Sequence, residues 1–333
     1  MRRHRTTARG GISLLLLFGL SAGVAAASPS GYPGQDGPGP RTRKPSAKPA
    51  TGKPAAVSAT RFVFPVVGRV QYTNDWGAPR SLGPHEGNDI MAPRRALAVA
   101  TEAGKIKFWT HSASAGCMLY LYGKSGTTYL YIHLNNDLTN GNDNRGKCVA
   151  GTSYAPSLKD GQKVQAGQLL GFVGDSGNAN GVATHLHFEV HPNDGGAVNP
   201  YKYLNRAYRP LFAVLPGGKF TLSANATVVS TALDPAGTSA TLKVDVKNLR
   251  VWPGGFRIPS VNRSIALTVA DTDSIQLLHT GPSPAASTVS LARLTAAKKG
   301  QSVTVTTSPA STKLEALLGR GLFDAATVVL KPS

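Results

Sequence analysis

The chain has few acidic residues and only two cysteines. Its 17 Asp and Glu residues are outnumbered by 36 Lys and Arg residues, which gives a formal net charge of +19. It contains no internal repeat and no apolar run of the roughly 20 residues that a membrane-spanning helix needs. A coiled coil and a multi-span membrane protein are therefore excluded, and 333 residues leave room for two modest domains with tails.

The N-terminus has the features of an export signal. Four arginines occur among the first nine residues, a short apolar run covers residues 12–20, and Ala25-Ala26-Ala27 supplies the small residues that signal peptidases cut. The alternative is a membrane anchor, but the apolar run is too short to cross a bilayer. We therefore expect residues 1–27 to be a signal peptide and the mature protein to be secreted or periplasmic, with no stable membrane span after cleavage.

The positive charge of the chain persists after removal of the signal peptide. Without its four arginines the formal charge is still +15. Such a balance favours anionic partners. The chain shows no nucleic-acid-binding motif and is expected to be exported, so nucleic acid is not the expected partner. Anionic cell-wall polymers, through their carboxylates and phosphates, are better candidates, although charge that serves only solubility is the alternative.

The two cysteines, Cys117 and Cys148, predict one disulfide. An isolated pair in an oxidising compartment is typical of a disulfide bond. The competing interpretation is a zinc site, but neither cysteine occurs in a CxxC or CxxH spacing. We therefore expect the pair to be bonded.

Composition divides the chain into a linker and two β-rich regions. Residues 28–60 contain seven prolines and five glycines and almost no large apolar side chains, so we expect a disordered linker there. Residues 61–206 lack a long helical period and are expected to be mainly β, in an antiparallel sheet. A polar, Asn- and Gly-rich insertion at 135–157 interrupts them. The strand-like runs of this region are Phe62–Val70, Ala98–Trp109, Met118–Tyr122, Thr127–His133, Leu169–Val173 and His185–Val190.

A second, small β-rich domain is expected at residues 207–333. Thr241–Leu249 and Ser302–Thr306 alternate apolar and polar side chains, as half-buried strands do. A short helix is predicted at Lys313–Leu318. These patterns suggest a β-sandwich-like module.

Two motifs suggest a metal site in the first region. His85 and Asp89 are four residues apart, but a Gly-Pro pair before them and Gly87 between them argue against a helix, so a loop that enters a strand is expected. His185 and His187 are two apart in a strand-like run and would point to the same side. Two neighbouring imidazoles seldom share a face without a use, although a structural pair is the plain alternative.

A lone histidine, His133, ends another strand-like run; taken alone, it is more often a core or surface residue. Two imidazoles and one carboxylate form a suitable zinc ligand set, with water in the fourth position.

Taken together and in this order, these motifs resemble the lysostaphin/LytM-type zinc metallopeptidase family, over roughly residues 62–203. The resemblance implies a duplicated hybrid motif β fold and a peptidase domain at 61–206. It implies a secreted zinc endopeptidase that hydrolyses the peptides of bacterial peptidoglycan. By the same resemblance, the metal ligands of one Zn²⁺ ion are His85, Asp89 and His187, and the catalytic histidines are His133 and His185. These two histidines would orient or deprotonate the zinc-bound water, hydrogen-bond the oxyanion and assist the leaving amine.

The alternative function is a catalytically silent wall-binding or regulatory member of the same fold. Members of that kind typically lack one or more metal residues, whereas all five positions are present here.

The chain departs from the family in two places. The insertion at 135–157 is longer than usual and is expected to wall one side of the cleft. Residues 93–97 replace a common Gly-Thr-Pro type of turn, and we expect little consequence from this change. Near the motifs, Glu189 is expected to accept a hydrogen bond from a ligand histidine, and His191 is expected at the surface.

Overall fold

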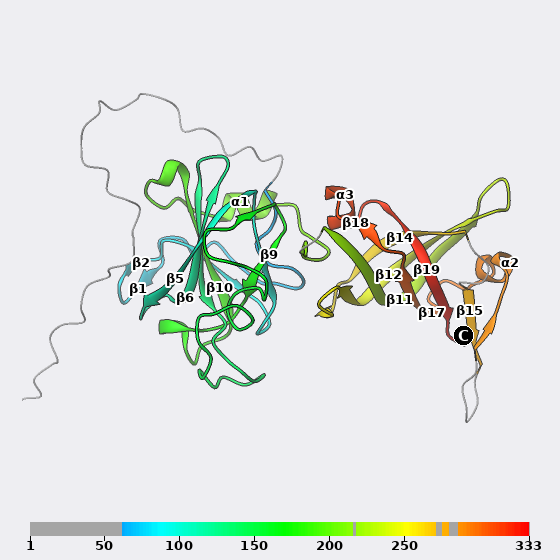
Figure 1. Cartoon of the computed structure of the whole chain (residues 1–333), viewed down its shortest axis with the longest axis horizontal. Helices are drawn as coiled ribbons and strands as arrows, with labels where there is room; N and C mark the ends of the chain where they lie inside the picture. The colour runs from blue at the N-terminus through cyan, green and yellow to red at the C-terminus, as the bar shows by residue number, and fades with distance from the viewer. Residues whose placement is uncertain (1–61, 216–217, 271–274, 280–285, 333) are drawn as a thin grey trace, which may run out of the picture. The chain divides into compact units, whose positions relative to one another are not determined.

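The computed structural model describes residues 62–215, 218–270, 275–279 and 286–332 (Figure 1). The predicted signal peptide at 1–27 and the predicted linker at 28–60 lie outside the described residues. Within the described ranges, no helix is both long enough and apolar enough to cross a membrane. This part of the chain is mainly β, as predicted.

The first region is built on a six-stranded antiparallel sheet, which confirms the predicted fold class. Two short strand pairs, β1–β2 and β4–β9, accompany it. Its strands follow the order β3-β10-β7-β6-β5-β8 and comprise β3 (Asn88–Met91), β10 (His185–His191), β7 (Thr128–Leu134), β6 (Gly116–Gly123), β5 (Gly104–Ser112) and β8 (Lys163–Val164). The short pairs comprise β1 (Pro79–Arg80), β2 (Gly83–Pro84), β4 (Leu97–Val99) and β9 (Leu169–Phe172).

The alternation of side chains along β10 shows which face of the sheet packs against the hydrophobic core. Leu186, Phe188 and Val190 are fully buried in the hydrophobic core. Because neighbouring residues of a strand point to opposite faces, the histidines between them lie on the other face. The sheet therefore presents a polar row along one strand while its opposite face forms the core.

Two predicted strands differ from the structure. Phe62–Val70 makes only isolated bridges, at Val63 and Val66. The run Ala98–Trp109 is divided, because β4 pairs with β9 whereas β5 pairs with β6 in the main sheet. The chain bends between the two sheets at residues 101–103.

Short helices lie between strands of the first region and after its last strand. They are the 3-10 helices η1 (Gly177–Ala179) and η2 (Pro192–Asp194) and the helix α1 (Tyr201–Arg206). After α1, the backbone N–H of Tyr208 donates to the carbonyl of Phe62, and Val214 exchanges hydrogen bonds with residues 167–169. The division at 206/207 remains a prediction.

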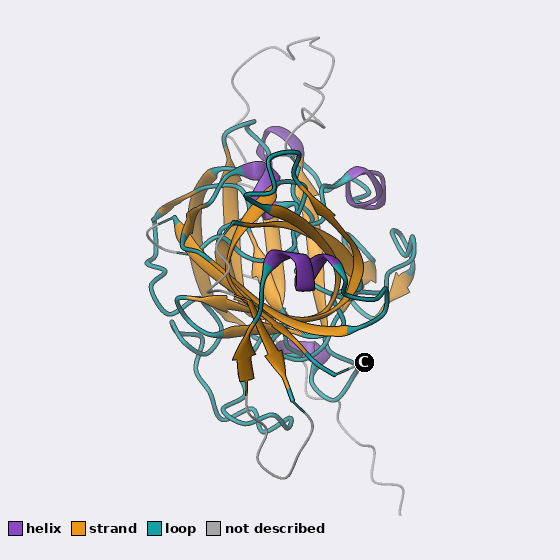
Figure 2. Ribbon diagram, turned by 90° about the vertical axis from the view of Figure 1, so that its right-hand side faces the viewer, coloured by secondary structure: helices purple, strands orange, loops and turns teal. Residues whose placement is uncertain are grey.

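The C-terminal strands form one nine-stranded sheet that curves strongly (Figure 2). A two-sheet sandwich was expected, and this expectation is wrong. Two register shifts between β11 and β12 are irregularities of the kind that bend strands, which lets one sheet curl on itself. Most pairs are antiparallel, but β19 runs parallel to β14 and β15. The elements are β11 (Lys219–Leu233), β12 (Ala240–Trp252), β13 (Phe256–Ile258), β14 (Arg263–Val269), β15 (Ile275–Leu278), β16 (Ala286–Thr288), α2 (Leu291–Thr295), β17 (Ser302–Thr307), β18 (Ala310–Ser311), α3 (Leu314–Leu317) and β19 (Leu322–Leu330).

The predicted disulfide is present. Cys117 on β6 is bonded to Cys148, with their Cα atoms 5.1 Å apart. Because Cys148 lies inside the 135–157 insertion, the bond ties this long polar segment to the main sheet.

We expect loss of this bond to lower the free energy of unfolding by about 3–4 kcal/mol, because it restricts a loop of about 30 residues in the unfolded chain. The Cys117→Ala/Cys148→Ala variant would be compared with the oxidised wild type by urea unfolding. Reduced wild-type protein serves as the control and should match the variant. Equal stability of the oxidised and reduced proteins would contradict the prediction.

Candidate metal centre

Three ligand atoms converge where β3 and β10 lie side by side. Asp89 is directly opposite His187 in the antiparallel register, and His85 comes just before β3. His85 Nε2 lies 2.8 Å from His187 Nδ1, and Asp89 Oδ1 lies 3.1 Å from each of these nitrogens. Two ligands about 2.0–2.1 Å from a tetrahedral zinc ion are about 3.3 Å apart, so these separations are close to those of a zinc ligand set.

In His85 and His187, the ring nitrogen that faces away from the cluster is held by an oxygen atom. His85 Nδ1 lies 3.0 Å from the backbone carbonyl oxygen of Asp75, and His187 Nε2 lies 2.9 Å from Glu189 Oε1. A carbonyl or an ionised carboxylate can only accept, so in the neutral imidazoles these two nitrogens carry the protons. The lone pairs of His85 Nε2 and His187 Nδ1 then face each other and Asp89, an arrangement that a cation stabilises.

Carboxylates around the centre favour positive charge on the histidines. Burial by itself lowers the pKa of His85, but hydrogen bonds to Asp75 and Asp89 outweigh it and raise that pKa to about 10. Burial also opposes the charged form of His187, yet Asp89 and Glu189 raise its pKa. The carboxylates thus create a negative electrostatic potential at the centre, whose side chains are largely buried.

Glu189 links His187 to a second, buried histidine. Its Oε1 accepts from His187, as expected, and its Oε2 lies 2.7 Å from Nε2 of His191. The prediction that His191 lies at the surface is wrong, since its side chain is only 6% exposed. Its Nδ1 donates to the carbonyl of Gly195 (2.9 Å), so both ring nitrogens face acceptors. Burial opposes a charge on His191, but Glu189 raises its pKa.

His133 reaches the same face by an unusual backbone conformation. It is the residue before the last of β7 and has a φ of 62°, in the left-handed region that few residues other than glycine adopt. Regular alternation would place its side chain with that of the buried Tyr131. Instead, its ring lies 5.1 Å from the ring of His185 and 5.9 Å from that of His187.

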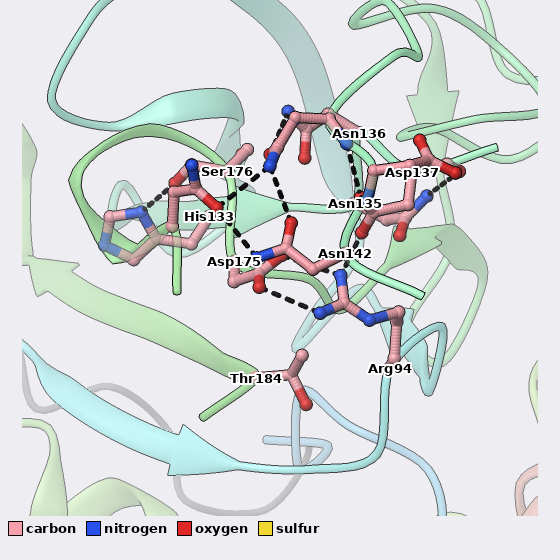
Figure 3. Close-up of polar contacts among 12 residues, drawn as sticks. Arg94, His133, Asn135, Asn136, Asp137, Asn142, Asp175, Ser176 and Thr184 are labelled. Carbon is pink, nitrogen blue, oxygen red and sulfur yellow. Dashed lines mark hydrogen bonds and ion pairs between the residues drawn. The ribbon is translucent and has the colours of Figure 1, made fainter. Parts of the chain in front are cut away.

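The hydrogen bonds of His133 and His185 leave one nitrogen of each ring available. Nδ1 of His133 donates to the backbone carbonyl of Ser176 (2.8 Å, Figure 3), and Nδ1 of His185 donates to that of Ala183 (2.9 Å). Burial, followed by the nearby histidines, lowers the pKa of His133 to about 3. A neutral His133 therefore offers the lone pair of Nε2. Nε2 of His185 lies 3.7 Å from Asp89 Oδ1.

The structure brings all five predicted site residues together, and it adds residues that the motifs did not indicate. Arg80 donates to Asp89 Oδ2 (2.8 Å), which leaves Oδ1 for the centre. Asp75 contacts both Arg80 and His85. No sequence signal marked Arg80 or Asp75, because both lie outside the HxxxD motif. Arg80 reaches Asp89 from β1, and Asp75, which precedes β1, accepts the backbone N–H of Asp89.

Gly87 has a steric role within the motif. A Cβ atom added at this position would lie 2.5 Å from Nε2 of His187. Any side chain here would displace the imidazole of His187, so the HxxxD segment needs glycine for this close approach.

Comparison with known proteins supports the predicted resemblance. Residues 83–200 match Peptidase family M23. The L-Ala–D-Glu endopeptidase of Bacillus subtilis (strain 168) is 26% identical over 154 residues. This alignment covers 43% of the chain and 42% of the relative, so the chain spans less than half of that protein's length.

Two solved structures are also similar to part of the chain. The catalytic domain of lysostaphin from Staphylococcus simulans is 25% identical, with 41% of this chain and 92% of that chain covered and a TM-score of 0.32. A zinc-containing peptidase from Vibrio cholerae is 23% identical, with coverage of 43% and 39% and a TM-score of 0.31. The resemblance to lysostaphin/LytM-type peptidases is confirmed by the match of residues 83–200 to Peptidase family M23 and by the B. subtilis relative.

Glu189→Leu should lower the free energy of unfolding of the metal-free protein by about 3–5 kcal/mol, because it leaves the imidazole N–H groups of the half-buried His187 and the buried His191 without this acceptor. Urea unfolding in the presence of a chelator measures this change. Glu86→Leu is the control: Glu86 is exposed within the same motif, and its substitution should change stability by less than about 0.5 kcal/mol. Equal effects of the two substitutions would contradict the prediction.

Proposed function

We propose, on the premise that residues 83–200 form a domain of peptidase family M23, that the chain is a secreted zinc-dependent endopeptidase that hydrolyses peptide bonds in bacterial peptidoglycan. The observation that carries the proposal is the convergence of His85 Nε2, Asp89 Oδ1 and His187 Nδ1 beside two further histidines. The name of the B. subtilis relative, a peptidase for the L-Ala–D-Glu bond, supports a wall peptide as substrate.

The residues of the centre fit a zinc ion. Two imidazole nitrogens and one carboxylate oxygen are a common zinc set that leaves a fourth position open. Arg80 donates a hydrogen bond to Asp89 Oδ2, which favours metal coordination through Oδ1 alone. When bound, Zn²⁺ lowers the pKa of a water molecule and polarises the carbonyl of the peptide bond.

The other two histidines supply proton transfer. His133 is neutral, its Nδ1–H donates to Ser176, and its Nε2 can accept a proton from the attacking water. His185 likewise has its Nδ1–H held by a backbone carbonyl. When Nε2 of His185 is protonated, it donates to the developing oxyanion or to the leaving amine.

We expect zinc-loaded protein to release new amino termini from purified peptidoglycan, and a chelator to abolish the release. His187→Ala removes a ligand and should lose both zinc and activity. His133→Ala leaves all three ligands and should keep one zinc per chain while turnover falls at least about 100-fold. Metal content is measured by mass spectrometry and released termini by chemical labelling.

The same experiment separates the alternative function. A catalytically silent wall-binding or regulatory member would bind the wall and release no termini even when loaded with zinc. Wild-type turnover in the His133→Ala variant would refute the role given to that histidine. The complete set of five residues is the observation that favours the active enzyme.

Attachment to anionic wall polymers is the second part of the proposal. Arg250 on β12 lies directly opposite Arg257 on β13, and both side chains are exposed. Like charges opposite each other destabilise a strand pair, so an anion that bridges them would be favoured. The guanidinium of Arg250 also lies 5.6 Å from the ring of Trp252, which is 44% exposed. Carboxylate or phosphate groups of a wall polymer suit this surface.

Arg250→Ala/Arg257→Ala should weaken co-sedimentation with cell walls about fivefold, which corresponds to about 1 kcal/mol, and should reduce its salt dependence. Arg293→Ala/Lys299→Ala removes the same charge from exposed positions of the same region and should have no such effect. Equal losses would indicate a general charge effect and no local site. Walls with and without their phosphate polymers would identify the anion.

A further inference from the structure

Arg94 is the centre of an ion-pair network next to the metal centre (Figure 3). Its guanidinium donates two parallel hydrogen bonds to Asp175, Nη1 to Oδ1 at 2.7 Å and Nη2 to Oδ2 at 2.9 Å. Nη1 also contacts the carboxylate of Asp137. Both aspartates are fully buried, and 17% of the arginine side chain is exposed. That the departure at residues 93–97 has little consequence remains a prediction, although Arg94 of this turn brings together three distant segments.

One arm of the network leads to His133. Asp175 is followed by Ser176, whose backbone carbonyl accepts the Nδ1–H of His133. Ser176 is held from a second side, because its Oγ accepts the backbone N–H of Cys117 at 2.9 Å. The ion pair of Asp175 and the hydrogen bond of Ser176 Oγ together fix the position of the Ser176 carbonyl. This carbonyl determines which nitrogen of His133 carries the proton.

The other arm leads into the 135–157 insertion. Oδ1 of Asp137 accepts the backbone N–H groups of Asp143 and Asn144, at 2.7 and 2.8 Å. Its backbone carbonyl accepts from Arg95 and Asn135. Among the hydrogen bonds found in the described ranges, none from Asp137 ends on Ser176 or His133. Both aspartates thus pair with the guanidinium of Arg94 and are equally buried. Asp175 is connected to His133 through Ser176, whereas Asp137 binds the backbone of the 135–157 insertion.

We propose that Asp175, held by Arg94, is a positioning residue that fixes the orientation and the Nδ1–H tautomer of His133 through the carbonyl of Ser176. Tight packing at this turn supports the assignment, since a Cβ atom added at Gly174 would lie 2.4 Å from Cα of Asn135. His133 affects turnover only under the proposed function, on which the assignment therefore rests. A ring with its proton on the wrong nitrogen could not accept a proton at Nε2.

Substitution of Arg94 itself would not be informative. It would leave two buried carboxylates without a cation, and such a loss destabilises a fold whatever its other roles. Substitution of one aspartate by asparagine keeps the shape and leaves the arginine paired with the other. The comparison of Asp175→Asn with Asp137→Asn therefore separates positioning from support of the fold.

The test uses full-length, zinc-loaded protein on purified peptidoglycan. For Asp175→Asn we expect kcat to fall about tenfold, with KM within about twofold and zinc content unchanged. Asp137→Asn should lower thermal stability and leave kcat within about twofold of the wild type. Equal losses of kcat in both variants would overturn the proposal, because support of the fold alone would explain them.

A second readout does not depend on activity. ¹⁵N NMR of the imidazole rings should show His133 as the Nδ1–H tautomer in the wild type and in Asp137→Asn, and as a mixture in Asp175→Asn. An unchanged tautomer in Asp175→Asn would overturn the proposal. If the wild type cleaves no peptidoglycan, the proposed function fails, whereas the NMR comparison still decides the positioning role.

Ser176→Ala provides a variant that leaves the ion pairs intact. It removes the Oγ contact to Cys117 but keeps the backbone carbonyl. We expect the same change of tautomer and of kcat, at smaller size and with a melting temperature close to that of the wild type. If Asp175→Asn does not fold, Ser176→Ala decides the matter, and a normal tautomer with normal kcat would then overturn the proposal.

Discussion

Each histidine of the centre has one ring nitrogen held by an oxygen acceptor, and this constraint decides what the other nitrogen can do. An imidazole offers a lone pair only at the nitrogen that lacks a proton. A fixed acceptor on one side therefore directs a lone pair to the other. The acceptors are the carbonyls of Asp75, Ala183 and Ser176 for His85, His185 and His133, and the carboxylate of Glu189 for His187.

A carboxylate near the second ring nitrogen distinguishes the proposed ligand histidines from the proposed catalytic His133. Both proposed ligand histidines have a carboxylate beside the second nitrogen, Asp75 at 3.3 Å from His85 and Glu189 at 2.9 Å from His187. A carboxylate partner increases the basicity of an imidazole and supports a cation on it. His133 has a backbone carbonyl there, and burial together with the neighbouring histidines keeps its ring neutral, so that Nε2 can accept a proton.

The fold supplies these acceptors from segments that are far apart in the sequence. The antiparallel register of β3 and β10 places Asp89 opposite His187, and β7 lies on the other side of β10. The β1–β2 turn brings Arg80 to Asp89, while the turn before β10 brings Ser176 to His133. The ion pairs of Arg94 and the disulfide hold the insertion to the same framework.

The sequence by itself determined the features that depend on periodicity and residue type within one element. Alternation placed His185 and His187 on one face of β10, and the order of the motifs indicated the family. The isolated cysteine pair predicted the disulfide.

Only the tertiary structure decided which groups meet across elements. Alternation would have turned His133 into the core, and the left-handed backbone at the end of β7 reverses this. The burial of His191, the pairing of Arg94 with two aspartates, and one curled sheet in place of a sandwich also depend on register and loop path. A local pattern determines which face of an element a side chain occupies, but its partners depend on how distant segments pack.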